Sequence, residues 1–166
     1  GRADEHWDPA TLPPGPAPAM DPTRLLMESQ VRAGVEQLMW NYVRAADTLN
    51  AEAYAALFTE DGAFNNVRGR EALRAMIAGM AEGQSGRRSS GQLAGNMHHI
   101  MSNQTIEVLS PTRARVHYYW QTVFGGPGIT PTPRVAAVGN GVDEVVLVDG
   151  RWLIRQLDVQ PTREQE

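Results

Sequence analysis

Apolar residues recur at three- and four-residue steps between positions 31 and 49, the spacing of one face of an α-helix. Asp21 and Pro22 precede this stretch as an N-cap residue and a first-turn proline. The pattern therefore predicts a long helix from residue 21 to about residue 49. Its buried face carries Val31, Val35, Leu38, Met39, Tyr42, Val43, Ala46 and Leu49.

Shorter elements are expected after this helix. Residues 51–58 read as a second helix, 59–62 as a turn and 63–67 as a short strand. Apolar residues at helical spacing predict a third helix over 69–80, and the glycines, serines and arginines of 83–95 predict a mobile loop.

Apolar and polar residues alternate from residue 97 onward, which is typical of strands. Four strands are expected, at 97–109, 113–124, 134–148 and 151–159, with Asp149-Gly150 as a hairpin turn. Helices followed by antiparallel strands predict an α+β domain. We expect the helices to pack on a strongly curved, mostly antiparallel sheet that encloses a hydrophobic pocket.

Composition sets further limits on the chain. Residues 1–20 hold five of the eleven prolines and predict a disordered or extended arm, so residues 21–166 form the single domain. The net charge of −4 without a basic cluster argues against nucleic acid. No apolar run approaches the roughly 20 residues that span a bilayer, so no membrane partner is expected.

Cysteine is absent, which excludes disulfides, thiol nucleophiles and cysteine-ligated metals. Zinc-type spacing and phosphate-binding glycine loops are also absent, so no metal and no cofactor are expected. A cytoplasmic location is favoured. Export after removal of a targeting segment stays open because the chain begins at Gly1 instead of methionine.

Three segments, read with the order of elements, carry a family resemblance: LFTEDG at 57–62, HHIMSN-x-x-I at 98–106 and DEVVLVDGRWLI at 143–154. Together they resemble the SnoaL-like branch of the nuclear transport factor 2-like superfamily, across residues 31–159. This resemblance implies a cone-shaped α+β fold with a deep hydrophobic cavity. Relatives include scytalone dehydratase, bile acid 7α-dehydratase, ketosteroid isomerase and polyketide cyclases, so the fold alone does not fix the reaction.

The resemblance also implies a catalytic set of Tyr42, Asp47 and His99, which match the pocket tyrosine, carboxylate and histidine of dehydratase-like members. A histidine, with an ordinary pKa of about 6.5, exchanges protons near neutral pH. We expect His99, oriented by Asp47, to act as general base and then acid, and Tyr42 to polarise the substrate carbonyl. His98 points to the opposite face of a regular strand, and a β-bulge would exchange the two histidines.

Further residues are expected to bind the substrate: Asn103 through a hydrogen bond, Tyr118 and Trp120 as pocket walls, Arg155 as a basic group, and His98 in reserve. Relatives usually place an arginine five residues after the tryptophan. Here that position is Leu157, and Arg155 lies two residues earlier with the same strand parity.

Three more positions differ from the usual family pattern or lie outside the expected site. Gly141 replaces an aromatic residue of many relatives, which would open the pocket or remove one wall. Asp143 is expected to be structural, and His117 to face solvent.

These observations predict a cofactor-independent lyase or isomerase that moves a proton through an enolate. The substrate would be a hydrophobic, polycyclic carbonyl compound such as a steroid or polyketide. The alternative is a non-catalytic module that binds a small hydrophobic ligand or serves in assembly. By family analogy, a homodimer or homotrimer is expected, associated through the outer face of the sheet.

Overall fold

The fold is built on one long helix, α2, which spans Pro22–Asp47. The computed structural model describes residues 21–128 and 131–161, so the N-terminal arm expected at 1–20 lies outside the described residues. The backbone carbonyl of Asp21 accepts a hydrogen bond from the N–H of Leu25, and Thr48 ends the helix. The expectation of a long amphipathic helix is confirmed.

The second helix, α3 (Ala51–Ala56), begins at Asn50, whose side chain accepts a hydrogen bond from the backbone N–H of Ala53 at 3.0 Å. The expected turn at 59–62 is wrong, because strand β1 (Phe58–Phe64) occupies it. A Cβ on Gly62 would lie 2.8 Å from the carbonyl oxygen of Ile154, so glycine allows close strand pairing here.

Helix α4 (Arg70–Ser89) runs much further than its apolar spacing predicted, and the expected loop from residue 83 is wrong up to residue 89. Tertiary contacts explain the extra turns. The buried amide of Gln84 contacts the sulfur of Met97 at 3.5 Å, and Arg88 donates to the carbonyl of Gly95 at 3.0 Å. Cations in the last turn also suit the helix dipole.

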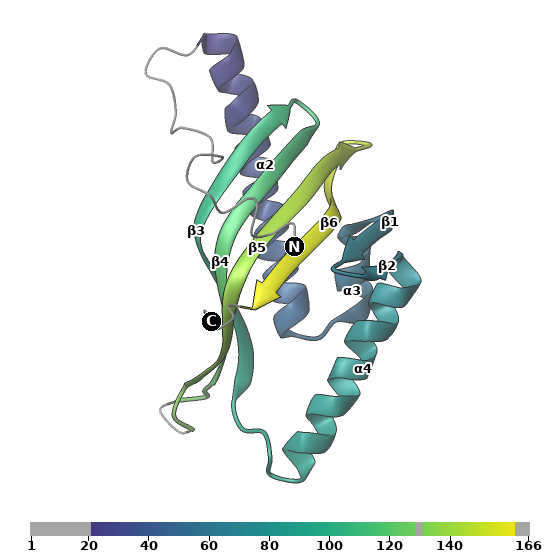
Figure 1. Ribbon diagram of the computed structural model, residues 1–166, viewed down its shortest axis with the longest axis vertical. Coiled ribbons are helices and arrows are strands. Elements are labelled where there is room, and N and C mark those ends of the chain that lie inside the picture. The colour runs from purple at the N-terminus through teal and green to yellow at the C-terminus, as the bar shows by residue number, and fades with distance from the viewer. Residues whose placement is uncertain (1–20, 129–130, 162–166) are drawn as a thin grey trace, which may run out of the picture.

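The sheet has six strands in the order β2-β1-β6-β5-β4-β3. β1 runs parallel to β6, and the other neighbouring strands are antiparallel. The sheet is strongly curved along α2, while α3 and α4 lie towards the β1–β2 edge (Figure 1). The remaining strands are β2 (Val67–Arg68), β3 (Asn96–Ser110), β4 (Arg113–Gly125), β5 (Arg134–Val148) and β6 (Arg151–Pro161).

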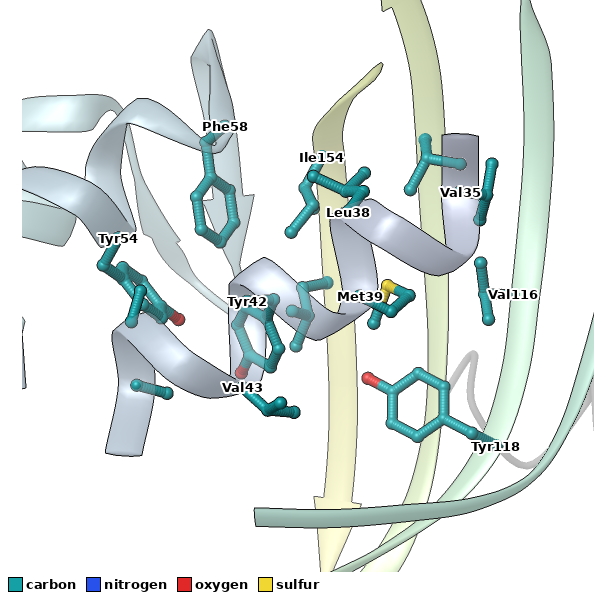
Figure 2. Close-up of a cluster of buried hydrophobic side chains, with 14 of the residues drawn as sticks. Val35, Leu38, Met39, Tyr42, Val43, Tyr54, Phe58, Val116, Tyr118 and Ile154 are labelled. Atoms are coloured by element: carbon teal, nitrogen blue, oxygen red, sulfur yellow. The ribbon is translucent and has the colours of Figure 1, made fainter. Parts of the chain in front are cut away.

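The core lies between α2 and the concave face of the sheet. Val35 and Met39 of α2 face Val116 of β4, and Leu38 faces Ile154 of β6 (Figure 2). Each such side chain stabilises the fold by about 1.5–3 kcal/mol when fully buried. The α+β class, with helices on a curved and mostly antiparallel sheet, is confirmed. In the ranges 21–128 and 131–161, no helix is long and apolar enough to cross a membrane.

Candidate functional site

Asp47 and His99 meet where the end of α2 crosses β3. Oδ1 of Asp47 lies 2.7 Å from Nδ1 of His99 and also accepts the backbone N–H of His99 at 2.7 Å. The carboxyl side chain is 8% exposed and the imidazole 21%. Two bonds to one oxygen fix the ring relative to its own backbone. When Nδ1–H donates to this oxygen, Nε2 keeps its lone pair for a substrate proton.

His98 lies on the other face of β3. The pairing of His98 with Val123 and of His99 with Thr122 is regular, so no bulge exchanges the two histidines. Nδ1 of His98, which is exposed, lies 3.0 Å from the carbonyl oxygen of Asn96. His98 lines an open polar groove that Asp47 also borders, away from the wall that contains His99. The strand period therefore selects His99 for the pocket.

The pocket is an apolar cavity of about 200 Å³ on the concave face of the sheet. His99 brings an imidazole into an otherwise largely apolar and aromatic wall. Trp120 is held as part of that wall because its indole N–H donates to the carbonyl of Asn140 at 3.0 Å. The lining residues are Tyr42, Phe64, His99, Met101, Tyr118, Trp120, Thr122 and Val159.

Tyr42 reaches this cavity from α2 and is only 5% exposed. Its ring lies 5.5 Å from that of Tyr54, centroid to centroid, and the Tyr54 ring lies 5.2 Å from that of Phe58. Burial raises the pKa of Tyr42 well above its usual value, and its interaction with the Tyr54 hydroxyl adds to the shift. Tyr42 is therefore a neutral phenol that keeps its proton at physiological pH.

Tyr118 brings a second phenol to the cavity, and its partner is Asp143. The Tyr118 hydroxyl lies 2.8 Å from Oδ1 of Asp143, which is fully buried. Within the described chain, Oδ2 of Asp143 has no hydrogen-bond partner. Burial raises the pKa of Asp143 well above its usual value, although the Tyr118 hydrogen bond opposes this shift; nearby Asp158 adds to it. Burial also raises the pKa of Tyr118.

Sequence reasoning missed this pair as a functional unit. Tyr118 pairs with Gly141 across β4 and β5, so Asp143, two residues further on, lies on the same concave face. The alternation of β5 carried this signal, because an acidic residue at an inward position needs a partner. Asp143 is buried, as its expected structural role requires, but its partner is a residue of the cavity wall.

Besides His98, two residues expected to bind substrate lie outside the pocket. Arg155 is exposed because Glu144 pairs with Gln156 and Val145 with Ile154, which makes Arg155 the extra residue of a β-bulge. Its assumed parity was wrong. Asn103 is also exposed, with φ of 53° in an irregular stretch of β3, and it does not line this cavity, so the geometry gives no support to its expected hydrogen bond with the substrate.

Two expectations about the sheet are also corrected. Gly141 does not open the pocket, because the ring of Tyr118 occupies the space that a side chain would take. His117 does not face solvent: it is 3% exposed, and its Nε2 lies 3.3 Å from Oε2 of Glu107. Arg115 donates to the same oxygen at 3.0 Å, so the three side chains cover one another on the convex face.

Tyr42, His99, Tyr118 and Trp120 thus line one cavity, and Asp47 contacts His99 from outside that lining, while the chemical roles of all five stay predictions. Among the described residues, no group of three or more His, Asp or Glu side chains is placed to hold a metal ion.

Comparison with known families gives a match over most of the chain. The model of the SnoaL-like domain matches residues 27–158. None of the curated proteins matches this sequence.

Solved structures share the fold at low sequence identity. A candidate scytalone dehydratase of Novosphingobium aromaticivorans has a TM-score of 0.65 and 24% identity, covering 84% of this chain and 89% of that one. An NTF2-like protein with a cystatin-like fold from the same organism has a TM-score of 0.64 and 20% identity, covering 84% and 88%. ActVI-ORFA of Streptomyces coelicolor has a TM-score of 0.65 and 18% identity, covering 79% and 97%. These likenesses establish the cone-shaped fold.

Proposed function

Since the chain belongs to the SnoaL-like family, we propose that it is a cofactor-independent lyase or isomerase that moves a proton through the enolate of a small apolar carbonyl compound. The observation that carries this proposal is the 2.7 Å contact between Asp47 and His99 in the wall of an apolar cavity. A histidine oriented by a carboxylate, beside buried neutral phenols, has the parts that enolate chemistry needs.

The reaction begins when Nε2 of His99 removes a proton from the carbon next to the substrate carbonyl. Asp47 holds Nδ1–H and stabilises the imidazolium that forms. A phenol of the cavity donates to the enolate oxygen, and Tyr42 is the donor expected from the sequence. In a lyase, the imidazolium then protonates a leaving hydroxide; in an isomerase, it protonates another carbon. Acid–base catalysis of this kind supplies about 10²–10⁴-fold in rate.

The volume of the cavity supports a small substrate. An apolar cavity of roughly 150 Å³ binds benzene, and pockets for drug-sized ligands start at about 300 Å³. The volume of about 200 Å³ lies between these values. The polycyclic steroid or polyketide expected from the sequence is therefore narrowed to a carbonyl compound of roughly one or two rings.

Two compounds with one carbon skeleton test the proposal. 4-Phenylbutan-2-one in D₂O reports proton removal through deuterium incorporation at the carbon between carbonyl and benzyl groups, measured by NMR. 4-Hydroxy-4-phenylbutan-2-one reports loss of water through the absorbance of the conjugated enone. His99→Ala is expected to slow both by about 10²–10⁴-fold. His98→Ala is the matched control, because His98 is adjacent, exposed and outside the cavity.

The outcomes separate the function classes. Water loss supports a lyase, and deuterium exchange without water loss supports enolate formation without elimination, the step that an isomerase also requires. Binding of the ketone without exchange contradicts catalysis on this compound class and favours the ligand-binding alternative. Equal rates for wild type and His99→Ala would remove His99 from the mechanism.

Self-association through the sheet is kept as a second proposal. Ile100, Tyr119 and Val138 lie on the convex face of β3, β4 and β5, and between 44% and 48% of each is exposed. Light scattering coupled to size-exclusion chromatography is expected to give a dimer or trimer, which Tyr119→Lys shifts towards monomer. A wild-type monomer contradicts this proposal.

A further inference from the structure

The phenol of Tyr118 lines the cavity and lies against two buried residues, Gly141 and Asp143. We propose that Gly141 and Asp143 are positioning residues that hold the Tyr118 hydroxyl as the hydrogen-bond donor to the carbonyl oxygen of the ligand. This inference rests on the proposed function, because it concerns the same cavity. It assigns to Tyr118 the role expected of Tyr42.

Gly141 provides the space in which the phenol lies. A Cβ at this position would be 2.2 Å from Cζ of Tyr118, 2.3 Å from Cε2 and 2.5 Å from the hydroxyl oxygen. Atoms at such distances overlap, so any residue larger than glycine forces the ring of Tyr118 to move. Strand pairing aligns Tyr118 with Gly141, so the ring lies across the neighbouring strand. The absence of a side chain thus sets where the hydroxyl stands.

Asp143 decides which way that hydroxyl donates. An ionised Asp143, 2.8 Å away, would accept the hydrogen bond of the Tyr118 hydroxyl. Only the lone pairs of the phenol oxygen would then be available to a ligand. A neutral carboxylic acid can donate its own proton to the phenol oxygen, which frees the phenol proton for the cavity. The burial of Asp143, which raises its pKa, and its unpartnered Oδ2 both favour the neutral acid.

Tyr42 is less suited to the same task because another phenol engages its hydroxyl. Tyr42 interacts with Tyr54 of α3, and the ring of Tyr54 in turn lies against that of Phe58. Tyr118 instead points from β4 towards the space beside α2 (Figure 2). The partner of Tyr118 is a carboxyl group that can donate a proton to the phenol oxygen. The hydroxyl proton of Tyr118 is then free to donate to a ligand oxygen.

The first experiment needs no ligand and is independent of the proposed function. Infrared spectra at neutral pH are expected to show the carbonyl stretch of a protonated carboxylic acid that disappears in Asp143→Asn and shifts in Tyr118→Phe. Tyr119→Phe, on the same strand but on the opposite face, is expected to leave the band unchanged. A carboxylate band that Asp143→Asn removes would overturn the inference.

The second experiment uses 4-phenylbutan-2-one labelled with ¹³C at its carbonyl. Donation from the protein lowers the stretching frequency of the bound carbonyl. Tyr118→Phe is expected to abolish this shift, as is Asp143→Leu, an apolar replacement of similar size. Asp143→Asn is expected to retain most of the shift, because its amide N–H can donate to the phenol oxygen. If Asp143→Leu does not fold, Tyr118→Phe and Asp143→Asn still give the comparison.

Gly141→Ala tests whether the space at Gly141 positions the Tyr118 ring. Gly79→Ala is the control, because a Cβ at Gly79 meets no atom within 4 Å. Gly141→Ala is expected to lose the carbonyl shift, and Gly79→Ala to keep it. Loss of the shift in Tyr42→Phe but not in Tyr118→Phe would overturn the inference and return the role to Tyr42. A wild-type protein that fails to bind the ketone contradicts the proposed function and this ligand role, while the ligand-free spectra still judge the state of Asp143.

Discussion

Asp47 and Asp143 are both largely or fully buried, yet their surroundings prepare them for opposite tasks. Asp47 accepts two N–H groups of His99 at one oxygen and borders a polar groove. Asp143 has a single phenol partner, no solvent contact and one oxygen without a partner in the described structure. Donors that stabilise negative charge suit a carboxylate, whereas isolation suits the neutral acid. Surroundings, more than residue type, determine what each acid can do.

The largest effect is expected at Asp47, where charge is needed. Asp47→Asn keeps the size of the side chain but loses the negative charge that stabilises the imidazolium of His99. The rate of deuterium exchange into 4-phenylbutan-2-one is expected to fall by about 10²-fold. Glu36→Gln is the control, since Glu36 is an exposed acid on the same helix. An unchanged rate for Asp47→Asn would break the comparison, because charge would then matter at neither buried acid.

A smaller, pH-dependent effect on stability is expected at Asp143. Its pKa is raised in the folded state, so above the unfolded pKa of about 3.9 the unfolded chain releases this proton first. Folding stability from this group therefore falls as pH rises from about 4 towards the raised folded pKa. Asp143→Asn removes this dependence on pH. The free energy of unfolding of the variant, relative to that of wild type, is therefore expected to increase as pH rises over that range. Urea unfolding of both proteins at several pH values measures this difference. If their free energies of unfolding change with pH in the same way, Asp143 is ionised in the folded protein.

The smallest effect is expected at an exposed acid, which gives the baseline for both buried ones. Glu52 of α3 lies 2.7 Å from Arg74 of α4, and their side chains are 76% and 41% exposed. Solvent screens such pairs, so Glu52→Gln is expected to change the free energy of unfolding by about 0–1 kcal/mol. Thermal unfolding measures the change. A larger loss in the free energy of unfolding would mean that solvent does not screen the Glu52–Arg74 pair.

Periodicity was enough to predict the elements that surround the site. Helix α2 and strands β3 to β6 were found because a buried helix face and a half-buried strand each repeat at their own spacing. The same alternation separates His98 from His99. The C-terminal half of α4 was missed because its glycines favour a loop locally, while the contact of Gln84 with Met97 is tertiary.

The site was only partly predictable for a related reason. Tyr42, Asp47 and His99 follow from regular elements and from the family resemblance. Arg155 was misplaced because a single extra residue reverses strand parity, and sequence does not reveal where such a bulge falls. The seat of Tyr118 on Gly141 depends on which residues face one another across β4 and β5, which is a matter of register.

The open sheet has a consequence for the behaviour of this protein in a crowded solution. Unpaired strand edges can recruit other chains and start aggregation. One edge here is β2, which is only two residues long, and the other is β3, interrupted near Asn103 by a left-handed residue. Short or irregular edges make poor templates for a further strand. The position that was first considered for substrate binding thus helps to keep separate molecules from joining edge to edge.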